Sequence, residues 1–268
     1  MKLLTSISQV QETLSNGKVP GKKSETNLFL SQNSLERYAV QKKIWGVWDT
    51  GASLLMRRDR DFFHLYGTYS NIERFEQLLD HLENKEIYVA DLVGRNGSQL
   101  VQESSFQKHG FEIHRKLKRI ARLPADLDLP PLAQKIEILD QQFSTQVLDH
   151  LEQFFDRFSE QIPELEDIEQ AMSKGQIIGI LRDSYLAAFL YYETDMKISN
   201  LRYWFVHPDF RDEKIGGYLI RQYLHNLGLS KVSRLWVVED NVNAIKRYEH
   251  YGYVDESLTD HVMIRRSK

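Results

Sequence analysis

Residues 201–220, LRYWFVHPDFRDEKIGGYLI, hold the side chains and backbone best suited to chemistry. An apolar strand pattern ends at His207-Pro208, a charged loop follows, and a helix pattern begins near Gly216-Gly217. The first amides of a helix lack intrahelical partners and carry partial positive charge, and glycine lets a phosphate approach them closely. Arg211 and Lys214 add positive charge. The stretch therefore predicts a pyrophosphate site, with close helix–strand packing at the glycines as the alternative.

A second stretch, residues 235–253, reads LWVVEDNVNAIKRYEHYGY. Here a strand pattern runs directly into a helix pattern that Asp240 or Asn241 can cap. Taken alone, this stretch predicts a capped helix in which Tyr248 packs into the core.

Together, and in this order, the two stretches resemble the GCN5-related N-acetyltransferase (GNAT) superfamily. In that family a fourth strand leads into an Arg/Gln-x-x-Gly-x-Gly/Ala loop at a helix start. A fifth strand leads into an Asn-x-x-Ala-x-x-x-Tyr-x-x-x-Gly-Phe/Tyr helix. The resemblance covers about residues 135–268 and implies an α/β fold: a mixed, mostly antiparallel twisted sheet flanked by helices.

The resemblance also implies where acetyl-CoA, as cosubstrate, would bind. The loop and helix start would hold its pyrophosphate through backbone amides, the preceding strand would bind the pantetheine arm, and Asn241 would contact that arm. The implied pyrophosphate contacts are Arg211, Asp212, Glu213, Lys214, Ile215, Gly216, Gly217 and Tyr218, and the implied strand contacts are Phe205 and Val206. Lys214 departs from the family, which has glycine there, so it must adopt a conformation that a non-glycine residue tolerates.

Tyr248 would lie near the thioester sulfur, where a phenol with a pKa near 10 is a reasonable proton donor to the departing thiolate. A strand N–H would stabilise the oxyanion. Glu193, at a strand end, is the preferred general base; Glu239 or a water chain is the alternative, and each carboxylate alone is explained more simply as solvated. Since the chain has no cysteine, we expect direct attack by a primary amine in a ternary complex, although a serine intermediate stays formally possible.

Length and proline placement predict two domains. Three of the six prolines lie within residues 124–131, and proline neither continues a helix nor fits a central strand. We therefore expect an N-terminal domain at 1–123, a linker at 124–133 and the acetyltransferase domain at 134–268.

The N-terminal half is predicted to be a degenerate copy of the same fold. Residues 106–111, FQKHGF, parallel residues 248–253, YEHYGY, and strands and helices follow in the same order. However, Phe106 stands where Tyr248 does, and residues 67–74 lack a paired-glycine loop. This copy should support the other by covering the acceptor cleft, shaping substrate choice or forming a dimer surface.

The composition limits which binding partners and which cellular compartment we expect. The net charge is −3 and the pI about 6.3, which does not favour nucleic acid. No apolar run approaches the roughly 18 residues that span a bilayer, and the start is too weak for a secretory signal, so we expect a cytoplasmic protein. The nine histidines show no metal-ligand spacing, so no metal is expected.

Two other functions stay open. The first is a non-catalytic module that binds acyl-CoA, which the loss of the loop glycine at Lys214 mildly favours. The second is an aminoacyl transferase of the tandem-GNAT type that uses aminoacyl-tRNA, which the absence of a basic surface pattern disfavours. The acceptor is expected to be a small molecule or peptide, and a homodimer is compatible with the sequence.

Overall fold

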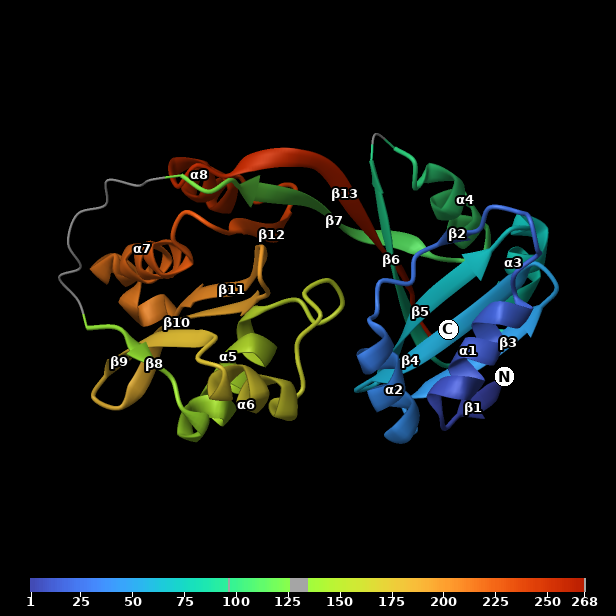
Figure 1. The fold of residues 1–268 in the computed structure, drawn as a ribbon, viewed down its shortest axis with the longest axis horizontal. Helices are drawn as coiled ribbons and strands as arrows, with labels where there is room; N and C mark the ends of the chain where they lie inside the picture. Colours follow the sequence, from blue (N-terminus) through green and yellow to red (C-terminus); the bar gives the residue numbers. More distant parts are fainter. Residues whose placement is uncertain (96, 126–134, 268) are drawn as a thin grey trace. The chain divides into compact units, whose positions relative to one another are not determined.

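The computed structural model describes residues 1–95, 97–125 and 135–267. Its contacts divide the chain into two compact units, one made of Met1–Leu117 with Leu258–Lys268 and the other of Lys118–Ser257 (Figure 1). This division differs from the sequential boundaries expected at residues 123 and 134. The end of the chain belongs to the first unit because its last strand pairs there. The expected linker lies outside the described residues, apart from Pro124 and Ala125.

The first unit is a sheet with helices. Its elements are β1 (Lys2–Leu4), α1 (Ile7–Asn16), β2 (Glu25–Thr26), α2 (Gln32–Val40), β3 (Ile44–Asp49), β4 (Ala52–Asp59), β5 (Phe62–Tyr69), α3 (Ile72–Leu79), β6 (Ile87–Arg95), α4 (Leu100–Lys108) and the first part of β7 (Glu112–Arg122). The strand order is β1-β3-β4-β5-β6-β13, where β13 (Val254–Arg265) enters from the end of the chain. Leu258 to Arg265 of β13 pair antiparallel with β6.

Local sequence explains the first unit's central elements. The β3–β4 hairpin turns at residues 49–51, where the Asp49 carboxylate accepts the Thr50 N–H at 2.6 Å and Gly51 has a φ of +96°. Asn71 caps α3 by accepting the Arg74 N–H at 3.2 Å. Both the turn and the cap follow from short local patterns in the sequence.

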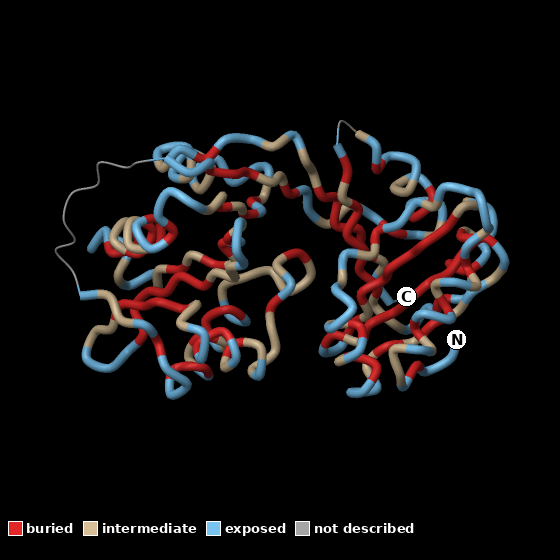
Figure 2. Tube along the Cα trace, in the orientation of Figure 1, coloured by how far each residue is buried: buried red, intermediate tan, exposed pale blue. Residues whose placement is uncertain are grey.

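The second unit has helices on both faces of its sheet. Its elements are β8 (Glu137–Ile138), η1 (Gln141–Phe143), α5 (Ser144–Phe154), α6 (Leu165–Ser173), β9 (Ile177–Arg182), β10 (Tyr185–Thr194), β11 (Ile198–Val206), η2 (Pro208–Glu213), α7 (Ile215–Leu227), β12 (Val232–Val238) and α8 (Val242–His250). The strand order is β7-β12-β11-β10-β9-β8. Helix α7 packs on one face, and α5 and α6 pack on the other. In each unit the buried segments follow the central strands (Figure 2).

A β-bulge interrupts β11 at Arg202. Against β10, Tyr203 lies opposite Tyr191, but Leu201 lies opposite Tyr192, so Arg202 is the extra residue. A bulge bends its strand and raises the local twist. The register therefore changes in the middle of β11, before the strand reaches its end at Val206.

Strands β11 and β12 run parallel but pair over only three residues. Ile198 to Asn200 pair with Val232 to Arg234, and beyond them the strands continue without pairing to each other. At the paired end, the Tyr223 hydroxyl from α7 lies 2.9 Å from Ser199 Oγ and 2.8 Å from Ser233 Oγ. This buried contact joins the two strands at their paired end, and beyond Asn200 β11 continues without pairing to β12.

The fold class expected from the sequence is confirmed: each unit is a mixed, mostly antiparallel sheet flanked by helices. Within the described parts of the chain, no helix is both long and apolar enough to cross a bilayer.

Asp260 on β13 gives a prediction about stability. Burial raises its pKa well above the usual range, and the neighbouring Asp91 carboxylate adds to the effect. The folded chain therefore keeps a proton that the unfolded chain releases near pH 4, so the free energy of unfolding should fall as pH rises above that value. Asp260→Asn should raise the midpoint of thermal unfolding by a few degrees at pH 8 and change it little at pH 4.

Thermal unfolding of both proteins at the two pH values tests this. A variant that is less stable at pH 8 would show that the Asp260 carboxylate is charged and partnered in the fold.

Candidate active site

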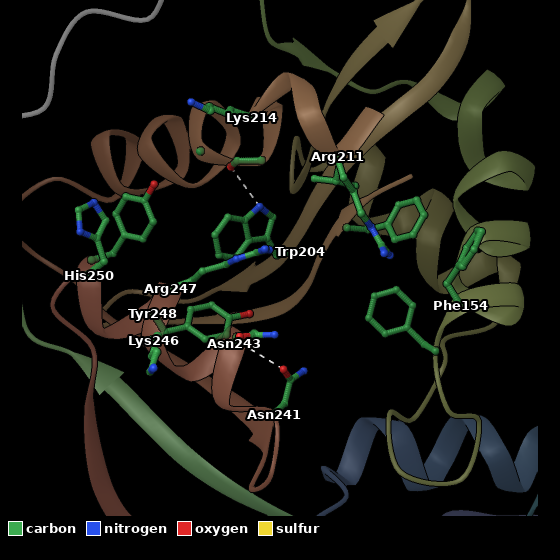
Figure 3. A pocket seen from close by; sticks show the side chains of 17 residues that line it. Phe154, Trp204, Arg211, Lys214, Asn241, Asn243, Lys246, Arg247, Tyr248 and His250 are labelled. Atoms are coloured by element: carbon green, nitrogen blue, oxygen red, sulfur yellow. Dashed lines mark hydrogen bonds between the residues drawn. The ribbon is translucent and has the colours of Figure 1, made fainter. Parts of the chain in front are cut away.

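A cavity of about 820 Å³ lies in the second unit where β11 ends and α7 and α8 begin (Figure 3). Such a volume is typical of sites for small molecules, which span about 300–1,000 Å³. Its lining residues are Phe154, Phe155, Trp204, Phe205, Val206, Arg211, Lys214, Gly216, Gly217, Asn241, Asn243, Ala244, Lys246, Arg247, Tyr248, His250 and Tyr251.

Trp204 fixes the start of α7 against β11. Its indole Nε1 donates a hydrogen bond to the Gly216 carbonyl at 3.1 Å. Its ring lies 5.5 Å from the Tyr248 ring and 6.2 Å from the Tyr251 ring, between centroids. The strand end, the helix start and α8 therefore meet around one aromatic side chain.

The two glycines at the start of α7 have different surroundings. A Cβ on Gly216 would lie 2.9 Å from Val206 Cγ2 and 3.3 Å from Trp204 Nε1, so this glycine permits close packing of α7 on β11. A Cβ on Gly217 would meet only the Tyr251 hydroxyl, at an ordinary 3.5 Å. Close helix–strand packing, the alternative to a pyrophosphate site, therefore explains the glycine at position 216. Packing does not explain the glycine at position 217.

Lys214 occupies the glycine position of the family pattern in a left-handed conformation. Its φ is +58° and its ψ is 18°, a region that costs a residue with a Cβ about 1–2 kcal/mol. Among the described residues, no side chain caps the start of α7. From the sequence, Lys214 was expected to adopt a conformation that a non-glycine residue tolerates. In the structure it does so, in a strained left-handed conformation.

The cavity is cationic. Arg211, Lys214, Lys246 and Arg247 line it, and none of the described lining residues is acidic. A concave site lined by one sign of charge attracts ligands of the opposite sign. The electrostatics therefore favour a polyanion at the opening between α7 and α8.

Tyr248 lines this cavity from α8, with its ring 5.5 Å from that of Tyr253 between centroids. Burial raises the pKa of Tyr248 well above 10; the charge of Glu160 adds to this effect, and that of Arg247 opposes it. The phenol is therefore protonated at neutral pH. Figure 3 shows its oxygen directed among the lining side chains, so it is placed to donate a proton and unsuited to act as a base.

Asn241 combines the two roles considered for it. Its side chain lines the cavity, and its Oδ1 accepts the Ala244 N–H at 3.1 Å, which caps α8. The predicted cap is confirmed, and the side-chain Nδ2 can still serve a ligand.

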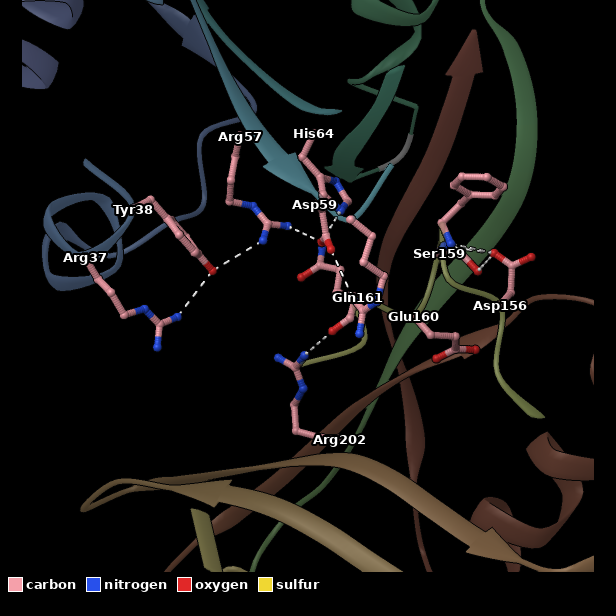
Figure 4. A network of polar contacts seen from close by, with 12 residues as sticks. Arg37, Tyr38, Arg57, Asp59, His64, Asp156, Ser159, Glu160, Gln161 and Arg202 are labelled. Carbon is pink, nitrogen blue, oxygen red and sulfur yellow. Dashed lines mark hydrogen bonds and ion pairs between the residues drawn. The ribbon is translucent and has the colours of Figure 1, made fainter. Parts of the chain in front are cut away.

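The wall opposite α8 comes from the segment after α5. Phe154 and Phe155 lie 5.1 and 6.1 Å from Phe205, between ring centroids. Within the segment, Asp156 Oδ1 accepts hydrogen bonds from the Ser159 N–H and Oγ at 3.0 Å each (Figure 4). The Tyr203 hydroxyl of β11 donates to the Glu160 carbonyl at 2.8 Å, which ties the segment to the bulged strand.

Four predicted pyrophosphate contacts are not among the lining residues. Ile215 is 1% exposed within the core, and Glu213 pairs with Arg182 at 2.6 Å. The Arg221 guanidinium carbon lies over the Tyr218 ring, 4.7 Å from the ring centroid. Asp212 is exposed. Their side chains do not build the cavity, so any part they take in binding would fall to their backbone amides.

Glu193 does not line the cavity either. It pairs with Asn200, whereas the first residue of β11 that lines the cavity is Trp204, opposite Leu190. Three residues of β10 at about 3.3 Å each put roughly 10 Å of strand between Glu193 and this edge of the cavity. Glu239, the alternative base, is exposed and also absent from the lining.

Sequence reasoning missed several lining residues. Asn243, Arg247 and His250 recur at four- and three-residue spacing on α8, which is a helical pattern that the sequence contains. Phe154 and Phe155 could not be found in this way, because the chain must fold back across the sheet to bring them here.

No group of three or more His, Asp or Glu side chains that could hold a metal ion occurs in the part of the chain that the structure describes.

Comparison with known proteins agrees with the geometry. Residues 143–253 match the model of the Acetyltransferase (GNAT) family. A tandem GNAT protein from the clavulanic acid biosynthesis pathway has a similar structure, with a TM-score of 0.62 at 10% identity over 98% of this chain and 95% of that one. A search of the curated proteins found no match.

Two further solved structures are similar. A GCN5-related N-acetyltransferase from Sphaerobacter thermophilus has a TM-score of 0.54 at 13% identity, covering 98% of this chain and 93% of that one. Another from Kribbella flavida has a TM-score of 0.54 at 14% identity, covering 83% and 90%. At these identities the likeness shows the fold, and the likeness to the tandem protein extends it over both units.

The glycine pair at the start of α7 gives a matched prediction. Gly216→Ala should lower the free energy of unfolding by about 1–3 kcal/mol, because the added methyl group overpacks the contact with Val206 and Trp204. Gly217→Ala should leave it nearly unchanged. Denaturant unfolding of both variants checks this, and equal losses would mean that the helix start is packed differently.

Proposed function

Because residues 143–253 match the model of the Acetyltransferase (GNAT) family, we propose that the second unit transfers an acetyl or small acyl group from acyl-CoA to a primary amine. The observation that carries this proposal is the parting of β11 from β12 beside a cationic cavity that holds Tyr248. The cavity combines a strand edge, a helix start and a proton donor. Acyl-CoA can use all three: the strand edge for the amides of its arm, the helix start for its diphosphate and the proton donor for its departing thiolate.

The end of β11 fits the arm of acyl-CoA. Beyond Asn200 the strand no longer pairs with β12, yet it runs on to Val206. Backbone groups on such an edge need partners. The pantetheine arm carries amide N–H and C=O groups, which can pair with Phe205 and Val206 as a neighbouring strand would.

The start of α7 fits the diphosphate. The backbone amides from Lys214 to Gly217 lie where a helix carries partial positive charge. Arg211 and Lys214 add cations beside them, and position 217 leaves room for a phosphate oxygen.

The proposed chemistry is a direct transfer. The neutral amine attacks the thioester carbonyl, a C–N bond forms, and a strand N–H stabilises the oxyanion. Collapse breaks the C–S bond, and the Tyr248 phenol gives its proton to the departing thiolate. The attacking nitrogen loses a proton, and solvent reprotonates Tyr248.

The base that receives the amine proton is not assigned. Glu193 was the sequence prediction, but it lies along the strand from the cavity, and none of the described lining residues is acidic. Water therefore replaces Glu193 as the preferred route for this proton. The acceptor is proposed only as a primary amine.

Tyr248→Phe tests the proton donor. Turnover of acetyl-CoA with an amine panel should fall at least about tenfold, because general-acid catalysis contributes about 100- to 10,000-fold, while the Kd for CoA stays within about twofold. Since burial raises the pKa of Tyr248, the activity that depends on its protonated form should persist above pH 10 and be lost only as pH rises through the raised pKa. Unchanged turnover in the variant would remove Tyr248 from the mechanism.

The Lys214→Gly variant tests the charge of Lys214 and its backbone strain by two separate measurements. Glycine adopts the left-handed conformation without penalty, so the variant should gain about 1 kcal/mol of unfolding free energy. Loss of the ammonium should weaken CoA binding by about fivefold at low salt and by less at high salt. Calorimetric titrations at two salt concentrations check this, and binding that is unchanged at both would show that Lys214 does not meet a phosphate.

A further inference from the structure

The first unit contains a second pair of parallel strands that separate. Phe62 to His64 of β5 pair with Ile87 to Val89 of β6, and no further residues of these strands pair with each other. Both strands nevertheless continue, β5 to Tyr69 and β6 to Arg95. The pairing of β11 with β12 also covers three residues and then stops.

In the first unit a segment of the same chain lies along the freed edge of β5. Strand β2 pairs antiparallel with it, placing Glu25 opposite Tyr69 and Thr26 opposite Thr68. Thr26 Oγ1 donates to the Gly67 carbonyl at 2.8 Å. The Asn27 N–H donates to the same carbonyl at 3.2 Å.

Asn27 joins the two separated strands. Its side chain is 3% exposed, and its Nδ2 donates to the Leu65 carbonyl of β5 at 3.0 Å and to the Asp91 carbonyl of β6 at 3.1 Å. Its Oδ1 accepts the Gly67 N–H at 2.6 Å. One side-chain amide thus satisfies three backbone groups that the parting of the strands would leave buried without partners.

We propose that residues 25–27 are an internal occupant of the first unit's strand gap. They take the place that the amide-bearing arm of acyl-CoA takes between β11 and β12, so that the chain binds one acyl-CoA. The comparison with the arm of acyl-CoA rests on the function proposed above. The statement that residues 25–27 fill the gap rests on the contacts of Thr26 and Asn27.

The helix that follows β5 agrees with this assignment. Helix α3 begins after Asn71, whose side chain accepts the Arg74 N–H, and Glu73 lies in its first turn. The helix start therefore has a side-chain cap and a carboxylate, whereas α7 has neither a side-chain cap nor an acid in its first turn. A diphosphate is accordingly disfavoured at α3, so the occupied gap and the helix start both point to one acyl-CoA site per chain.

The first test is the stoichiometry of CoA binding to the full chain by isothermal titration calorimetry. We expect one equivalent. Two equivalents with comparable affinity would overturn the proposal, because the first unit would then have an open gap.

The second test asks whether Asn27 holds the gap, using hydrogen exchange of the Gly67 amide without any ligand. In Asn27→Ala, which loses the acceptor of this amide, exchange should be at least about tenfold faster than in the wild type. The matched control is Asn33→Ala, at an exposed position of α2, and it should exchange like the wild type. Equal Gly67 exchange in all three proteins would overturn the proposal.

The two tests separate this inference from the proposed function. If CoA did not bind at all, the acyltransferase proposal would fail, and the exchange of Gly67 would still decide whether residues 25–27 hold the gap. Should the Asn27→Ala chain fail to fold, the stoichiometry of the wild type would decide the question.

Discussion

Two parallel strands that part inside a sheet leave backbone N–H and C=O groups facing each other across a gap, and the rest of this structure depends on how those groups are satisfied. An unpartnered buried polar group costs about 1–3 kcal/mol, so such a gap must hold water, a ligand or a piece of chain. In the second unit, β11 is joined to β12 at one end through Tyr223 and bent at Arg202. The end of β11 beyond this point lines a cationic cavity that also holds the Tyr248 phenol.

The two units use one architecture in different ways. In the first, Asn27 bridges the parted strands with its own amide, and Phe106, which the FQKHGF motif matches to Tyr248 in sequence, is fully buried. In the second, the gap borders the cavity, and the helix beside it starts at a strained Lys214 and two glycines. That strain is a local cost to stability, and it is understandable if the lysine charge serves the ligand.

Much of this could be predicted from the sequence, because hydrophobic period, caps and turn residues are local. The strand that ends near His207, the helix that begins near Gly216-Gly217, the loop with Arg211 and Lys214, and the Asn241 cap followed from short patterns. The bulge at Arg202, the wall at Phe154 and Phe155 and the return of β13 to the first unit depend on contacts between distant residues. Glu193 shows the limit of prediction from local patterns. The sequence places this carboxylate at a strand end, but only the strand register shows that it lies opposite Asn200 and away from the cavity.

A crystal structure of the full chain with acetyl-CoA tests the central claim most directly. The account predicts the pantetheine amides paired with the backbone of Phe205 and Val206, the diphosphate against the amides from Lys214 to Gly217, and the sulfur beside the Tyr248 oxygen. An arm bound elsewhere, with the end of β11 still unpaired beside β12, would contradict it.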